Sequence, residues 1–214
     1  MRVLYEGDVM PDHSNATDRL DAELADHQIA FRDNRLVAHR IVDGLSLERF
    51  NWRPAPERWS IAQCLAHLNI SARLYADRME AAICEGRDAG VLGASPFHYG
   101  LLARMLARAV DPANRKKSRS PAKFAAPPGQ TYDPRDLLQQ FDGAGARWER
   151  CLHEANGLDL ARVKVKSPAV SWIRLPLGAL FGIQAAHERR HLHQAEAVLT
   201  QQAQGPVSHA NDPY

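Results

Sequence analysis

The sequence predicts an all-α fold, a four-helix bundle with a long irregular connection between its second and third helices. Four long segments repeat their apolar residues at the 3.6-residue period of a helix. Capping and helix-breaking residues bound these segments. Amphipathic helices of this length bury their apolar stripes by packing against one another. The chain shows no repeat of fixed period and no glycine-rich phosphate loop.

One domain accounts for most of the chain, over residues 16–202. The 214 residues are 45% hydrophobic and 24% charged, a composition typical of soluble globular proteins. We expect an irregular lead at residues 1–15 and a flexible tail at residues 203–214, because both are polar. Residues 86–130 are interpreted as a crossover within this domain, since neither side alone has enough helices to close a core.

The first two helices are bounded by recognisable signals. The first is expected over about residues 17–45, with Gly44 close to its end. The second begins after Ser60, because Gln63 follows three residues later as in a capping box. Apolar residues continue at helical spacing to about Cys84.

The last two long helices are equally well marked. The third is expected from about Pro134 to Asn156, with Asp133 as its N-cap and Gly157 ending it. The fourth is expected over about residues 176–202.

Three shorter stretches lie between these helices. We expect a short helix at about residues 99–110 and extended chain at residues 163–175, where Val and Lys alternate. Residues 115–119 carry four Lys or Arg in a Pro/Ser-rich stretch without aromatics. This composition is more typical of a solvated loop than of a phosphate-binding patch.

Charge and cysteine content exclude several classes of protein. A net charge of +2 does not imply a nucleic-acid partner, and no stretch is long and apolar enough to span a bilayer. The three cysteines, Cys64, Cys84 and Cys151, are widely spaced and odd in number, so a disulfide framework is not expected. Since the N-terminus has no apolar signal core, we expect a cytoplasmic protein.

The motif His187-Glu-Arg-Arg-His191 fits the H-E-x-x-H pattern of zinc peptidases. Two histidines four residues apart lie one helical turn apart, so both can reach one metal ion. A peptidase needs a third ligand downstream, but Gln194 and Ala197 occupy the positions of the glycine and histidine of the extended motif. The only later glutamate is Glu196, little more than one turn away. The peptidase interpretation is therefore disfavoured.

A third ligand must come from upstream, and His67 is the first candidate. It lies near the apolar stripe of the second helix, so it can join the two histidines in a three-nitrogen site with open positions. His27, on the stripe of the first helix, is the second choice. Cys64 lies nearly one turn from His67, but a small buried role is favoured for it. The alternative is that neighbouring carboxylates or backbone groups satisfy these histidines.

A glutamate and two tryptophans are further candidates for roles near this site. Glu188 lies on the core stripe of the fourth helix, where it can act as a catalytic general base, support a ligand, or pair with an arginine at a bundle seam. Trp52 and Trp59 are expected to anchor the turn before the second helix rather than to stack on a substrate.

Two stretches, "FNWRPAPERWSIAQCLAHLNISARLY" (50–75) and "LGALFGIQAAHERRHLHQAEAVL" (177–199), together resemble the DinB-like (YfiT-like) superfamily. The resemblance implies a four-helix bundle whose three histidines hold a divalent metal, often zinc or nickel. On this chain these are His67, His187 and His191. Relatives include S-transferases that use low-molecular-weight thiols and a mycothiol-dependent isomerase, while others are described as metal-dependent hydrolases. The long 86–130 connection departs from the smallest members, so no particular thiol is carried over.

The expected function follows from this resemblance. It is a metal-dependent enzyme that transfers a low-molecular-weight thiol to an electrophile, or a related detoxification. A metal-dependent hydrolase is the first alternative, and a non-enzymatic metal- or ligand-binding bundle is the second. We expect a small-molecule substrate, no nucleic-acid or membrane partner, and a homodimer as one oligomeric state.

Overall fold

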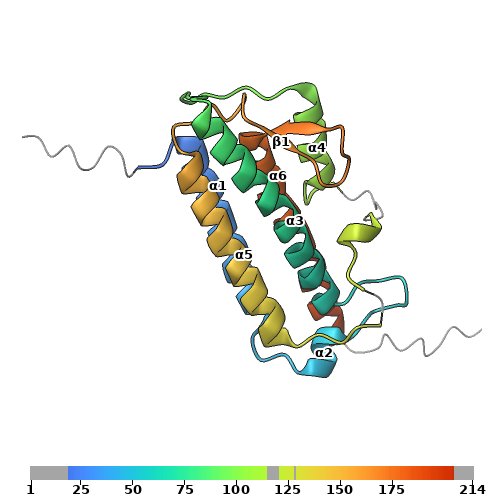
Figure 1. The fold of residues 1–214 in the computed structure, drawn as a ribbon. Helices are drawn as coiled ribbons and strands as arrows, with labels where there is room; N and C mark the ends of the chain where they lie inside the picture. The colour runs from blue at the N-terminus through green and yellow to red at the C-terminus, as the bar shows by residue number, and fades with distance from the viewer. Residues whose placement is uncertain (1–18, 115–120, 128, 205–214) are drawn as a thin grey trace, which may run out of the picture.

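The structure is a computed structural model that describes residues 19–114, 121–127 and 129–204. It confirms the predicted all-α fold, in which long helices pack side by side as a bundle (Figure 1). The long helices are α1 (Ala22–Val42), α3 (Ile61–Asp88), α5 (Pro134–Ala155) and α6 (Leu177–Ala203).

Shorter elements connect them. The short elements are α2 (Leu47–Asn51), α4 (Leu101–Val110), the 3-10 helix η2 (Ala122–Phe124), β1 (Lys164–Lys166) and β2 (Arg174–Pro176). The expected lead at residues 1–15, the basic stretch 115–119 and nearly all of the expected tail lie outside the described residues.

The directions of the helices explain the long connection. α3 and α5 run in the same direction, while α1 and α6 run opposite to them (Figure 1). The chain must therefore return along the length of the bundle between α3 and α5. The described parts of residues 89–133 lie on this return and include α4 and η2.

Local capping chemistry sets the ends of the helices. The side chain of Ser60 accepts a hydrogen bond from the Gln63 backbone amide, and the side-chain oxygen of Gln63 accepts one from the Ser60 backbone amide, which completes the predicted capping box. The first helix ends at Val42, earlier than predicted, because Gly44 adopts a positive φ of 68° that a helix cannot contain. Ser46 then caps α2, a short helix that the sequence pattern did not reveal.

The stretch expected to be extended is a small hairpin. Only its two ends form strands, and β1 pairs with β2 in antiparallel fashion. Val165 lies opposite Leu175, and both side chains are buried, whereas the neighbouring Lys164, Lys166 and Arg174 are exposed. The alternation of Val and Lys therefore corresponds to one buried and one solvated face.

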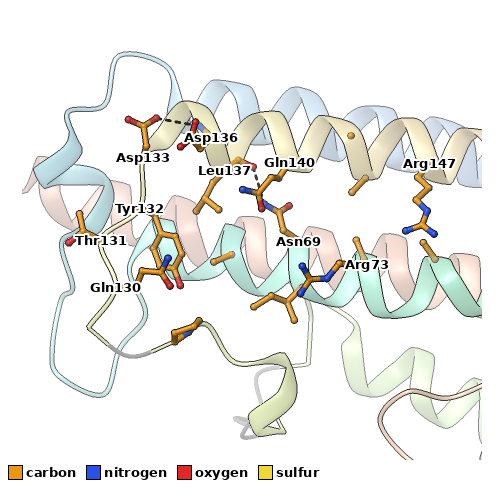
Figure 2. A pocket seen from close by; sticks show the side chains of 17 residues that line it. Asn69, Arg73, Gln130, Thr131, Tyr132, Asp133, Asp136, Leu137, Gln140 and Arg147 are labelled. Atoms are coloured by element: carbon orange, nitrogen blue, oxygen red, sulfur yellow. Dashed lines mark hydrogen bonds between the residues drawn. The ribbon is translucent and has the colours of Figure 1, made fainter.

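A groove of about 710 Å³ lies between α3 and α5 (Figure 2). Asn69 and Arg73 of α3 line it on one side, and Gln140 and Arg147 of α5 line it on the other. The backbone carbonyl of Leu137 accepts a hydrogen bond from Asn69, which ties the two helices together beside the groove. None of the three candidate histidines lines this groove.

The core consists of two apolar clusters that follow one another along the bundle. On α1, Phe31 belongs to the first cluster and Ala38 to the second; on α6, Ala185 belongs to the first and Leu192 to the second. Polar side chains lie where one cluster gives way to the other. We call this set the polar layer, and it comprises Asn34, His67, His187, Glu188 and His191.

Candidate metal centre

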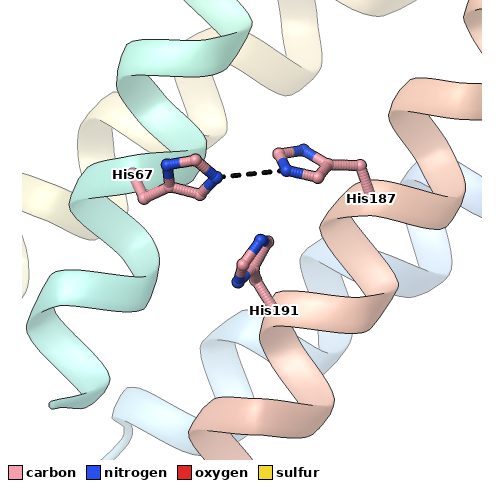
Figure 3. Close-up of side chains that lie close together, drawn as sticks. All are labelled: His67, His187 and His191. Atoms are coloured by element: carbon pink, nitrogen blue, oxygen red, sulfur yellow. Dashed lines mark hydrogen bonds between the residues drawn. The ribbon is translucent and has the colours of Figure 1, made fainter. Parts of the chain in front are cut away.

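The three predicted histidines meet within the bundle (Figure 3). His67 comes from α3, and His187 and His191 come from successive turns of α6, which packs against α3. One ring nitrogen from each histidine lies within 4.8 Å of the others. The Nε2 atoms of His67 and His187 are 3.1 Å apart. Among the described residues, no other group of His, Cys, Asp or Glu converges in this way.

Hydrogen bonds orient two of these rings toward their meeting point. His67 Nδ1 lies 2.7 Å from the carbonyl oxygen of Phe124. A carbonyl oxygen only accepts, so Nδ1 carries the proton and Nε2 presents its lone pair to the other histidines. His191 Nδ1 lies 3.1 Å from Oε1 of Gln194 in the same manner. Histidines that ligate metals are held by such outer hydrogen bonds, so the residues present fit a metal ion.

The electrostatic environment keeps the rings neutral. Burial lowers the pKa of His67, and it lowers the pKa of His187 well below its usual range, with the nearby His191 adding to the effect. Burial, reinforced by His67, lowers the pKa of His191 to about 3. Neutral imidazole is the form that binds metals, so the site is ready for an ion at neutral pH.

Trp59 forms one wall of this centre. Its ring stacks on His191, with centroids 5.5 Å apart and an interplanar angle of 24°, and its centroid lies 5.0 Å from that of His67. The sequence prediction assigned Trp59 only to the turn before α3. The contact could have been predicted from the position of Trp59, which directly precedes the N-cap of α3 about two helical turns before His67. Trp52, in contrast, is 41% exposed.

The long connection also contributes to the centre. The carbonyl that holds His67 belongs to Phe124 in η2, whose side chain is 5% exposed and stacks on Tyr75. Every residue has a backbone carbonyl, so no residue type in this segment predicts the acceptor.

Glu188 lies in the polar layer, but its carboxylate faces α1 and α5, whereas the three histidines meet between α3 and α6. Its carboxylate accepts hydrogen bonds from Trp148 Nε1 of α5 at 3.0 Å and from Asn34 Nδ2 of α1 at 3.1 Å. These partners, rather than an arginine, hold it. Burial raises its pKa to about 7, although both hydrogen bonds act in the opposite direction. Its catalytic role stays a prediction.

The remaining candidates lie elsewhere. His27 lies beside Phe181, with its Nε2 3.6 Å from the Glu23 carboxylate, and is not one of the converging histidines. Cys64 is completely buried in the second apolar cluster, and burial raises the pKa of its thiol to about 12. Cys64 therefore has the small buried role favoured from the sequence.

Comparison with known families agrees with this geometry. The model of the DinB superfamily matches residues 30–195, which include His67, His187 and His191. Searches of curated proteins and of solved structures found no significant match. Since the family match covers well over half of the chain, the protein belongs to the DinB superfamily.

Proposed function

We propose that this protein is a divalent-metal-dependent enzyme in which His67, His187 and His191 hold zinc or nickel. We further propose that it transfers a low-molecular-weight thiol to a small electrophile. The observation that carries the proposal is the convergence of three neutral, oriented imidazoles from α3 and α6.

The chemistry of this donor set supports an enzyme. A divalent ion held by three neutral ligands keeps its full charge and an open position, and it acidifies bound water or thiol, toward a pKa of ~7 in the zinc–water case. In the chain itself, Phe124 and Gln194 hold the ligand rings in place. Trp59 excludes water from one side of His191. His187 and His191 keep partial exposure, which leaves an approach for a small molecule.

Thiol transfer and hydrolysis both require the three histidines to hold the metal ion. Membership of the DinB superfamily supports thiol transfer as the first candidate. Hydrolysis is the second candidate, because a site that acidifies a thiol also acidifies water.

The first experiment is the metal content of untagged protein by mass spectrometry, with wild type beside His67→Ala and His187→Ala. We expect about one equivalent in wild type and none in either variant. His193→Ala is the matched control, because His193 is exposed on the same helix. Helicity by circular dichroism checks that each variant folds. Wild type that takes up no metal even after reloading contradicts the proposal.

The second experiment separates the candidate reactions. In cobalt-loaded protein, a small thiol should change the visible spectrum, and an electrophile should be consumed only when thiol is present. Ester cleavage without thiol identifies the hydrolase instead. A spectrum that neither thiol nor imidazole changes indicates a closed, non-enzymatic site.

A further inference from the structure

Helix α4 buries only one side of its apolar surface against the rest of the protein. Its Ala103 side chain is buried, and Leu106 and Val110 pack against the first apolar cluster. The apolar sector continues around the helix, because Leu101 and Met105 are one turn apart on the outer side. These two side chains are 71% and 66% exposed. Exposed apolar side chains that adjoin one another on one helix face indicate a binding surface.

Cations flank this outer sector. Arg104 and Arg108 follow each other by one turn beside Leu101 and Met105, and both are exposed. Neither forms an ion pair with another described residue. The helix contains no Asp or Glu. An exposed helix that joins an apolar sector to cations is typical of helices that lie in a membrane interface.

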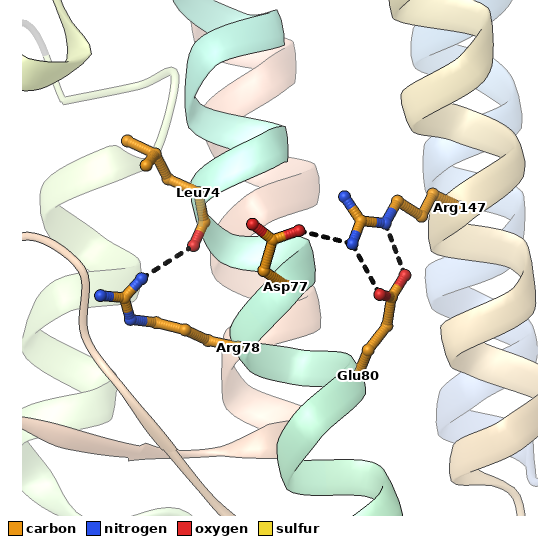
Figure 4. A network of polar contacts seen from close by, with 5 residues as sticks. All are labelled: Leu74, Asp77, Arg78, Glu80 and Arg147. Carbon is orange, nitrogen blue, oxygen red and sulfur yellow. Dashed lines mark hydrogen bonds and ion pairs between the residues drawn. The ribbon is translucent and has the colours of Figure 1, made fainter.

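The β1–β2 hairpin adds a second element of the same character. Its loop passes across α4 in both Figure 1 and Figure 4. Trp172 in this loop is 83% exposed, the residue type that proteins place at the level of lipid headgroups. Residues 160–177 contain no acid, and their four basic side chains are all exposed. These are Arg162, Lys164, Lys166 and Arg174.

Although the sequence alone predicts no membrane partner, we propose that the outer face of α4 and the β1–β2 hairpin form a docking surface for an anionic lipid bilayer. Leu101, Met105 and Trp172 enter the interface between headgroups and acyl chains, and the six cations face the anionic headgroups. We call this set of nine residues the docking face. No helix among the described residues is long and apolar enough to cross a membrane. The docking face needs no such helix, because α4 lies along the surface.

Charge favours a membrane over a second copy of the chain. If two copies of the chain packed together through their docking faces, the six cations of one copy would lie against the same six cations of the other. The resulting repulsion has no acidic residue within α4 or residues 160–177 to relieve it. An anionic bilayer supplies the missing negative charge over a wide area.

The test is co-sedimentation of the full chain with vesicles of phosphatidylcholine alone and with vesicles that also contain phosphatidylglycerol. We expect binding to the anionic vesicles, weakened by added salt, and little binding to the neutral ones. Arg104→Gln with Arg108→Gln should weaken binding about 25-fold, since each cation near an anionic surface contributes about fivefold. Leu101→Ser with Met105→Ser should weaken it about tenfold or more.

The matched control is Ile29→Ser with Leu36→Ser. These side chains are 56% and 67% exposed on α1, away from the docking face, so their removal should leave binding unchanged. Because all these side chains are exposed, the variants should keep the wild-type circular dichroism. Equal binding to both vesicle types, or wild-type binding by both docking-face variants, overturns the proposal. So does an absence of binding to either vesicle type, and a dimer that Leu101→Ser with Met105→Ser dissociates would then assign the face to a second copy. None of these results depends on metal content.

Discussion

His67 and His187 place their Nε2 atoms 3.1 Å apart although 120 residues separate them in the chain. His67 donates its only proton, on Nδ1, to the Phe124 carbonyl, so its Nε2 lone pair points at the second ring. Two lone pairs at this distance repel each other unless a proton or a cation lies between them. The fold therefore brings together two nitrogens that either a proton on His187 Nε2 or a shared cation can bridge.

Metal should stabilise the protein against heat. Metal-free protein given zinc or nickel at about one hundred times the dissociation constant gains about 3 kcal/mol, because the ion binds only the folded chain. For a chain of this size the melting temperature should rise by about 6–10 °C. Differential scanning fluorimetry measures the rise, and a chelator should reverse it. His187→Ala should show no rise, and an equal rise in that variant would place the ion elsewhere.

Phe124 should influence metal affinity without touching the metal. Phe124→Leu loosens the packing of η2 on Tyr75 and so displaces the carbonyl that holds His67. We expect the metal to bind about 10- to 100-fold more weakly, the usual effect of losing an outer hydrogen bond to a ligand. Competition with a chromophoric chelator measures this. Phe141→Leu is the control, because Phe141 is equally buried on α5. Similar affinity losses in both variants would indicate a general loss of stability.

Trp59 should report metal binding by fluorescence. Its ring stacks on His191, so nickel or cobalt bound by the histidines lies close enough to quench its emission. We expect titration of the metal-free protein to lower the fluorescence in a saturable manner. Trp59→Phe should abolish most of the change, while Trp172→Phe should preserve it, since Trp172 is exposed on the hairpin. A change that survives Trp59→Phe would assign the signal to another tryptophan.

Glu188→Gln should lower the free energy of unfolding by about 1–3 kcal/mol. Both partners of this carboxylate are donors, and an amide has only one oxygen to offer them. Either Trp148 Nε1 or one of the two Asn34 Nδ2 hydrogens is therefore left without an acceptor in the core, although Asn34 keeps its hydrogen bond to the Ala185 carbonyl. Denaturant unfolding measures the loss, with Glu196→Gln on the same helix as the control, since that change removes only a surface ion pair with Arg40. If the predicted catalytic role is also correct, turnover of the metal-loaded variant falls while its metal content stays unchanged.

The ion pairs of Arg147 should make stability depend on pH. Its guanidinium contacts Glu80 at 2.5 and 2.6 Å and Asp77 at 2.6 Å, which joins α5 to α3 (Figure 4). The hydrogen bond from Arg147 lowers the pKa of Glu80 below its ordinary value of 4.5. The stabilisation is therefore fully present above about pH 4.5 and is lost as the pH falls through the lowered value.

Arg147→Met should accordingly be less stable than wild type at pH 7, with a difference that shrinks on acidification. Urea unfolding across this pH range measures the difference. Arg73→Met is the control, because Arg73 is exposed and forms no ion pair with the described residues. A constant difference at all pH values would show that Arg147 acts through packing alone.

Much of the fold was predictable because its signals are local. The capping box at Ser60 and the Asp133–Pro134 start of α5 depend only on neighbouring residues, and both were found where predicted. The inward placement of His67 and His191 followed from helical spacing. Periodicity alone did not predict that α3 packs against α6 and brings these histidines together. That prediction came from the family resemblance.

The missed features depend on contacts between distant segments. Asn34 looks like an ordinary polar residue on α1 until α6 brings Glu188 to it. The Phe124 carbonyl has no sequence signature at all, because every residue has a carbonyl. The end of the first helix was misplaced for a local reason, since Gly44 stops a helix sooner than the apolar spacing suggests.

The polar layer also determines how the helices align along the bundle axis. If α6 slid by one turn against α1, Glu188 would leave Asn34 and enter an apolar cluster, where a buried carboxylate without donors costs several kcal/mol. The apolar side chains on either side tolerate such a slip far better, since Leu and Phe pack in many arrangements. The polar layer in the middle of the bundle thus specifies the register of the helices, as single buried polar residues do in coiled coils.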